Sequence, residues 1–116
     1  MHARKLQLFL DPISPYGYLA WPHLKALGRR TPLQVEVVPT LFAGLLNAHG
    51  QKGPAEIQSK RRYIFLDCAR TAQLLHVPFR LPPAHPFNPL LPLRMMISTE
   101  SLDDRAKLTE SLLTAC

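Results

Sequence analysis

The sequence predicts an α/β protein that begins with a parallel β-α-β unit and continues as a mainly helical region. Two short runs rich in apolar residues, 5–11 and 33–39, flank a segment with leucines near one helical face. A strand, a helix and a second strand within about 35 residues favour parallel strands joined by a right-handed crossover. Beyond residue 56, apolar residues recur at helical spacing, which is typical of an amphipathic helix.

The first strand and helix meet in FLDPISPYGYLAW, residues 9–21. In KLQLFLD, residues 5–11, polar and apolar residues alternate and the run then becomes apolar, which is typical of a largely buried strand. Ser14 is the expected N-cap of the helix, with Pro15 at the first helical position, where the missing N–H has no partner to lose. Pro22 is expected to kink this helix or to limit its first turn, and Gly28 with the two following arginines to end it.

The second half is expected to hold helices around one proline-rich connection. One helix covers residues 56–76, with an apolar face at Ile57, Ile64, Cys68, Ala72 and Leu75. Residues 77–89 contain five prolines and are expected to be extended. A short helix follows, and Ser101 is the expected N-cap of the last one.

Composition and charge narrow the class of protein. The 116 residues are 47% hydrophobic and 19% charged, which is typical of one small globular domain or part of a larger one. A net charge of +6 favours anionic partners, but the cations are scattered, so a nucleic-acid surface is disfavoured. No apolar run is long enough to span a membrane, and no signal-peptide core follows the first basic residues, so a cytoplasmic location is expected.

The two cysteines, Cys68 and Cys116, do not form a C-x-x-C pair. A dithiol redox site or a zinc site made of cysteines alone is therefore not expected, and the histidines show no spacing that suggests metal ligation. Cys68 is expected to be a core thiol because it lies on the apolar face of its helix.

The two strands are expected to be incompletely covered. Two parallel strands do not make a stable sheet alone, and the final helix lacks a stop signal after Cys116. We expect apolar residues at one edge of the strand pair to be exposed or covered by another chain. The sequence reads as the first part of a longer protein.

Three stretches in chain order resemble 2-hydroxychromene-2-carboxylate isomerases and the related kappa-class glutathione transferases. They are FLDPISPYGYLA, PTLFAGLLNAHGQKGPAEIQSKRRY and VPFRLPPAHPFNPLLPLR. The resemblance implies a DsbA-like thioredoxin fold with a helical insertion. Residues 1–40 would be the N-terminal β-α-β part of the thioredoxin-like domain and residues 41–116 the helical insertion, with the C-terminal thioredoxin half absent.

The resemblance also implies a glutathione site. Ser14 stands at the corner where the redox relatives have a cysteine, and its hydroxyl would donate a hydrogen bond to the sulfur of glutathione; the alternative role is a plain N-cap. Lys60 matches a family lysine near the cofactor, although it also fits a solvated helix surface. Gln51 occurs where relatives often have asparagine. Because the rest of the family's site lies beyond these residues, we expect this chain alone to bind glutathione weakly or not at all.

The same resemblance places Asn47, His85 and Asn88 near the pocket for a small anionic aromatic substrate. The implied reaction converts 2-hydroxychromene-2-carboxylate into trans-o-hydroxybenzylidenepyruvate, with glutathione as cofactor and a homodimer as the assembly. Three alternatives stay open: a kappa-class-like glutathione transferase, a DsbA-like oxidoreductase relative, and a non-catalytic fragment or binding module.

Overall fold

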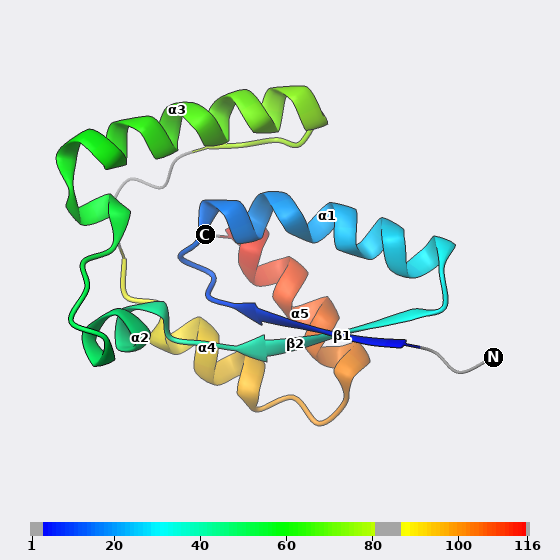
Figure 1. Ribbon diagram of the computed structural model, residues 1–116. Coiled ribbons are helices and arrows are strands. Elements are labelled where there is room, and N and C mark those ends of the chain that lie inside the picture. The colour runs from blue at the N-terminus through cyan, green and yellow to red at the C-terminus, as the bar shows by residue number, and fades with distance from the viewer. Residues whose placement is uncertain (1–3, 81–86, 116) are drawn as a thin grey trace.

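The computed structural model describes residues 4–80 and 87–115 (Figure 1). In chain order the elements are β1 (Arg4–Leu10), α1 (Pro15–Arg30), β2 (Leu33–Pro39), α2 (Phe42–Ala48), the short 3₁₀ helix η1 (Pro54–Glu56), α3 (Gln58–Leu75), α4 (Leu90–Ile97) and α5 (Leu102–Ala115). The expected order of strand, helix, strand and then helices is confirmed.

The two strands form a parallel pair, as the sequence predicts. The register pairs Arg4 with Leu33 and Leu10 with Pro39. Because side chains alternate between faces, Leu8 and Leu10 of β1 lie on the same face as Val35 and Val37 of β2. This is the face that the helices cover.

The main core lies between this face of the strands and the helices α1, α4 and α5. Its buried members come from five elements and are Leu10, Trp21, Val37, Leu93, Met96 and Leu113. Arg105 joins three of these elements, because its guanidinium donates to the carbonyl oxygens of Val37 and Met96 at 3.1 and 3.0 Å. Helix α5 is therefore held to both β2 and α4 by one side chain.

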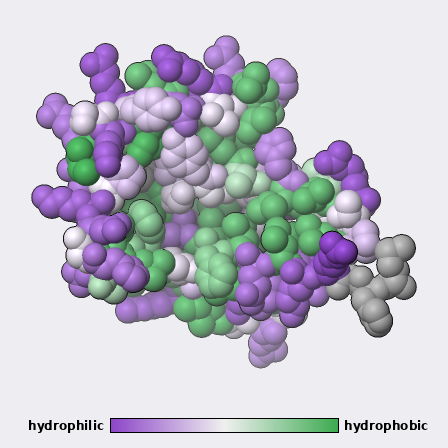
Figure 2. Space-filling model, in the orientation of Figure 1, coloured by the Kyte–Doolittle hydropathy of each residue, from purple (hydrophilic) through white to green (hydrophobic). Residues whose placement is uncertain are grey.

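The other face of the strands is open, so the expectation of a largely buried first strand is wrong. Only Leu10 of β1 is buried, and Phe9, which lies on the open face, is 65% exposed. On the covered face, Leu6 near the start of the strand is still 37% exposed. Glu36 lies on the open face, where it accepts a hydrogen bond from Gln7 and pairs with Lys5. Figure 2 shows apolar side chains gathered over the strands with hydrophilic ones around them. The expected exposure of apolar strand residues is confirmed.

Helix α1 begins where the sequence predicts and runs on through its proline. Ser14 is the N-cap and Pro15 opens the helix, while Pro22 lies within one continuous helix. The helix ends at Arg30, so Gly28 lies in its last turn. The end is fixed by Thr31, whose N–H and hydroxyl both donate to the carbonyl of Leu27.

A second, smaller core joins α3 to α1. Cys68 and Ala72 of α3 are buried against Leu19 of α1, which confirms the predicted core thiol. The proline-rich segment contributes Val77 and Phe79 to this cluster. Its described parts, residues 77–80 and 87–89, contain no helix or strand, as predicted.

Candidate functional site

The candidate site is the corner where β1 ends and α1 begins. Ser14 has an extended backbone and is half-buried. Its N–H donates to the carbonyl of Asp11 at 2.9 Å, and its Oγ accepts the N–H of Gly17 at 3.1 Å. The predicted cap is therefore present, and it fixes the position of the hydroxyl at the start of the helix.

This geometry leaves the hydroxyl able to donate. A serine hydroxyl has one O–H donor besides its acceptor lone pairs, and the cap uses only an acceptor. The start of a helix carries positive potential and N–H groups without helical partners. The corner can thus stabilise a negatively charged atom placed beside Ser14, with the hydroxyl as the directed donor.

Asp11 holds the corner in place, and the sequence reasoning missed it. The residue is only 5% exposed, and its carboxylate accepts the N–H groups of Ile13 at 3.1 Å and Phe42 at 2.9 Å. The first bond closes a local turn, for which Asp before Pro is a recognisable signal. The second joins the corner to the start of α2, and no local pattern reveals that contact.

Gly17 allows the helix to approach the strand closely. A methyl group at this position would place its carbon 2.5 Å from Cδ1 of Leu10, which is itself buried. A side chain at Gly17 would force Leu10 or the helix to move. The glycine therefore sets how near the first turn of α1, with Ser14 at its head, lies to the end of β1.

Helix α3 is attached to this first turn through Tyr16. The phenol donates to Oδ2 of Asp67 at 2.6 Å, and this hydrogen bond raises the pKa of Tyr16 well above its ordinary value. Burial raises the pKa of the neighbouring Cys68 thiol, with the Tyr16 hydroxyl acting in the opposite direction. Cys68 is therefore a protonated, enclosed thiol next to the site and not an exposed nucleophile.

Of the two predicted cofactor residues, Lys60 lies on α3 and Gln51 lies in the loop after α2, and the corner contacts both of these helices. Gln51 follows α2 and is exposed, and its N–H donates to the carbonyl of Leu46. Lys60 is exposed in the first turn of α3, two turns before Asp67 on the same side of the helix. Within residues 4–80 and 87–115, no hydrogen bond or ion pair joins either side chain to Ser14.

The predicted substrate residues are not assembled into one pocket by the described contacts. Asn47 is exposed near the end of α2. Asn88 is exposed, and its Oδ1 accepts the N–H of Leu90 at 3.0 Å at the start of α4. His85 lies outside the described residues.

In the part of the chain that the structure describes, neither a metal-binding cluster nor a membrane-spanning helix is present. Among those residues, no group of three or more His, Cys, Asp or Glu side chains is placed to hold a metal ion. None of the described helices combines the length and the apolar character needed to cross a bilayer.

Comparison with known proteins gives one family and several relatives. The model of the DSBA-like thioredoxin domain matches residues 5–115. The chain is 32% identical to rat (Rattus norvegicus) glutathione S-transferase kappa 1 over 79 residues, which are 68% of this chain and 35% of that protein. It is 31% identical to Caenorhabditis elegans glutathione S-transferase kappa 2 over 100 residues, which are 84% of this chain and 40% of that protein.

A solved 2-hydroxychromene-2-carboxylate isomerase has the same fold over nearly the whole chain. The TM-score is 0.85 at 21% identity, and the match covers 96% of this chain and 55% of the isomerase. The chain thus spans about a third to two fifths of the curated relatives and about half of the solved structure. The predicted thioredoxin-like α/β fold is confirmed.

Proposed function

Because the chain belongs to the DSBA-like thioredoxin domain family, we propose that it uses glutathione at the corner around Ser14. The proposed reaction is the isomerisation of 2-hydroxychromene-2-carboxylate to trans-o-hydroxybenzylidenepyruvate. The observation that carries the proposal is the position of Ser14, whose Oγ accepts the N–H of Gly17 and keeps its own proton available. The likeness to kappa-class transferases supports glutathione as the cofactor.

The residues at the corner fit a thiolate. Ser14 offers a directed O–H donor, and the start of α1 offers positive potential, which together favour the ionised form of a nearby thiol. When bound, glutathione would supply a thiolate that adds reversibly to a substrate double bond, so that rotation about the resulting single bond becomes possible. Asp11 and Gly17 would keep the Ser14 hydroxyl in one position throughout, which is the protein's contribution to orientation.

Lys60 and Gln51 are proposed as further cofactor contacts. Lys60 supplies a mobile positive charge on the side of α3 that faces the Tyr16 contact, which suits a carboxylate of the tripeptide. Gln51 offers an amide that can both donate and accept. Asn47, His85 and Asn88 remain the proposed substrate contacts, and a homodimer remains the proposed assembly.

Two sulfurs would be needed for the redox alternative, which is therefore disfavoured. Disulfide exchange in a C-x-x-C site uses an exposed low-pKa cysteine and a partner. Here the corner has Ser14, and Cys68 is fully buried with a raised pKa. Transfer of glutathione to an electrophile is the second candidate, favoured by the identity to the kappa-class transferases.

The test is a titration of the full chain with glutathione. Calorimetry measures the binding, and the ultraviolet absorbance of the thiolate measures the ionisation of the bound thiol. We expect weak, saturable binding, with a dissociation constant of about 1 mM. The thiol of bound glutathione should ionise at lower pH than free glutathione. In Ser14→Ala this shift should shrink by about one pKa unit or more, because a hydrogen bond to a charged group contributes about 1.5–3 kcal/mol.

Ser101→Ala is the matched control. Ser101 caps α5 by accepting the N–H of Asp104 at 3.0 Å, so this variant also loses an N-cap hydrogen bond, at a different helix. This variant should leave the pKa of the bound glutathione thiol unchanged. If the bound glutathione thiol has the same pKa in wild type and in Ser14→Ala, Ser14 acts only as a helix cap. Turnover of 2-hydroxychromene-2-carboxylate, compared with conjugation of an aryl halide, then separates the isomerase from the transferase.

A further inference from the structure

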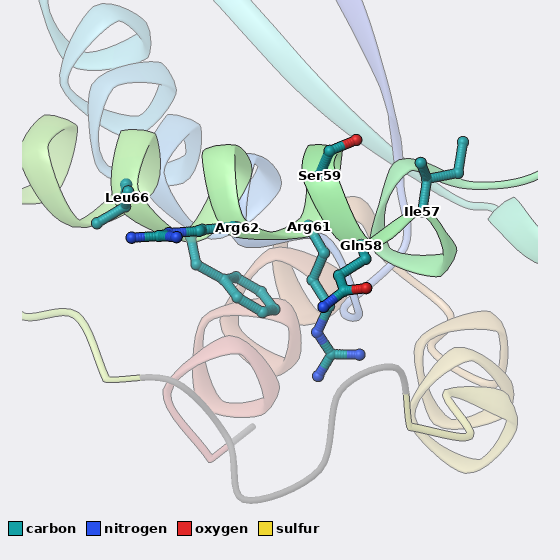
Figure 3. A pocket seen from close by; sticks show the side chains of 7 residues that line it. Ile57, Gln58, Ser59, Arg61, Arg62 and Leu66 are labelled. Atoms are coloured by element: carbon teal, nitrogen blue, oxygen red, sulfur yellow. The ribbon is translucent and has the colours of Figure 1, made fainter.

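Two hollows outside the corner at Ser14 differ in how they are built. One, of about 870 Å³, lies on the first turns of α3, and Figure 3 shows Ser59 and Arg61 leaving this helix in different directions. The other, of about 350 Å³, lies between α1 and α5 over the first residues of β2. Because three elements wall the second hollow, a ligand there would be surrounded by protein.

This second hollow, the α1–α5 groove, has an apolar lining. The lining side chains without charge include Trp21, Leu24, Leu33, Val35 and Ala106. The groove runs along the second half of α1, whereas Ser14 caps the start of that helix. A ligand of this groove is therefore separate from the glutathione proposed at the corner.

The indole of Trp21 brings an unused hydrogen-bond donor to the groove. Trp21 is only 5% exposed, and within residues 4–80 and 87–115 its buried Nε1 has no hydrogen-bond partner. The other buried side chains of the main core carry no nitrogen or oxygen, so the groove is the side from which an acceptor can reach this N–H. A buried tryptophan N–H normally has an acceptor, and a ligand that supplies one removes the cost of leaving it unpaired.

The charges at the rim of the groove are largely paired. Lys25 of α1 pairs with Glu110 of α5, and Lys107 pairs with Asp103 one turn away. Arg29 is exposed at the margin. A ligand therefore needs no charge of its own, and a charged group would lose hydration against the apolar lining. Because the Lys25–Glu110 pair is partly exposed, it can open at little cost to admit a ligand.

We propose that the α1–α5 groove binds a small neutral molecule with an aliphatic chain and a carbonyl oxygen, of the aliphatic ketone class. The carbonyl oxygen accepts the N–H of Trp21, and the chain lies against Leu24 and Val35. The volume is near the lower end of the range for ligand pockets, so the ligand is small. This class differs from both the tripeptide and the anionic acid proposed for the corner.

The probe is hexan-2-one, titrated into the full chain labelled with nitrogen-15. Trp21 is the only tryptophan in the sequence, so its indole N–H gives a single magnetic resonance signal. The proton of this signal should shift downfield as the hydrogen bond forms, and the shift should saturate with a dissociation constant of about 1 mM. A groove that holds only water would give no saturable shift, and this result would overturn the proposal.

Three variants, each with circular dichroism matching wild type, test the lining. Ala106→Leu fills the groove and should abolish the saturable shift. Ala69→Leu is the matched control, because it adds the same side chain at an exposed position of α3 outside the groove, and it should change affinity less than twofold. Trp21→Phe removes the donor, and calorimetry should find hexan-2-one binding about fivefold weaker.

Hexanoate has the same number of carbon atoms and tests the preference for a neutral ligand. It should bind about fivefold more weakly than hexan-2-one, or weaker still. The proposal is overturned if hexanoate binds as tightly as hexan-2-one, if Ala106→Leu binds like wild type, or if Ala69→Leu loses as much affinity as Ala106→Leu. Glutathione should not displace hexan-2-one, so the proposed function and this proposal fail independently.

Discussion

The phenol of Tyr16 donates a hydrogen bond of 2.6 Å to Oδ2 of Asp67, a residue 51 positions further along the chain. This contact joins the first turn of α1, which Ser14 caps, to the middle of α3, which carries Lys60 in its first turn. The corner at Ser14 and helix α3 are therefore connected through one hydrogen bond and the small core around Cys68.

Breaking this contact should loosen α3. Tyr16→Phe and Asp67→Ala should each lower the free energy of unfolding by about 0.5–1 kcal/mol, a modest loss because Tyr16 is partly exposed. Urea unfolding measures this loss of stability. The double variant should lose little more free energy of unfolding than either single variant. Tyr63→Phe, at an exposed tyrosine of the same helix, should be neutral. Additive losses in the double variant would show that the two side chains do not interact.

The close approach at Gly17 gives a second prediction. Gly17→Ala should lower the free energy of unfolding by about 1–3 kcal/mol, because the new methyl carbon would overlap Leu10. Gly44→Ala is the matched helical control, since its nearest contact would be an ordinary 3.5 Å to Cδ2 of Leu41. That variant should be neutral or stabilising by up to about 1 kcal/mol, because alanine favours helix. A thermal unfolding comparison in which both variants behave alike would contradict the packing described for Gly17.

The carboxylate of Asp11 should be the strongest single determinant of the corner. Asp11→Ala leaves the N–H groups of Ile13 and Phe42 without their acceptor, and should destabilise the fold by about 1–3 kcal/mol for each group that stays buried. Asp11→Asn keeps one acceptor oxygen and should lose less. Asp103→Ala, at an exposed ion pair with Lys107, should change stability by about 0.5 kcal/mol or less. The denaturant midpoints of the three variants are compared with that of wild type. An Asp11→Ala midpoint equal to that of wild type would contradict the stabilising role of the Asp11 carboxylate.

The raised pKa of Cys68 predicts a stability that falls in alkali. The thiol is protonated in the folded chain at a pH where the unfolded chain has begun to ionise it. Its contribution is therefore complete below the ordinary thiol pKa of 9.0 and is lost as pH rises toward the folded value. Unfolding free energies measured between pH 9.0 and 10.0, below the ordinary tyrosine pKa, should decline in wild type. The decline should be smaller in Cys68→Ala, and equal slopes would show that another group titrates.

Features set by a few neighbouring residues could be predicted from the sequence. The cap at Ser14, the proline at the start of α1 and the order of strands and helices depend on contacts within one or two turns. The parallel pairing followed from the length of the crossover. Even the buried position of Cys68 followed from helical spacing, because one face of a helix must meet the core.

Contacts between residues far apart in the chain became visible only in the tertiary structure. The second bond of Asp11 reaches Phe42, Tyr16 reaches Asp67, and the guanidinium of Arg105 reaches β2. The burial of β1 also depended on which faces the helices cover, so KLQLFLD looked buried although Phe9 is exposed. Alternation tells which side chains share a face, whereas only the packed elements determine whether anything covers that face. The sequence by itself thus determined the elements and the chemistry at the head of α1, and packing determined what holds that corner and what lies beside it.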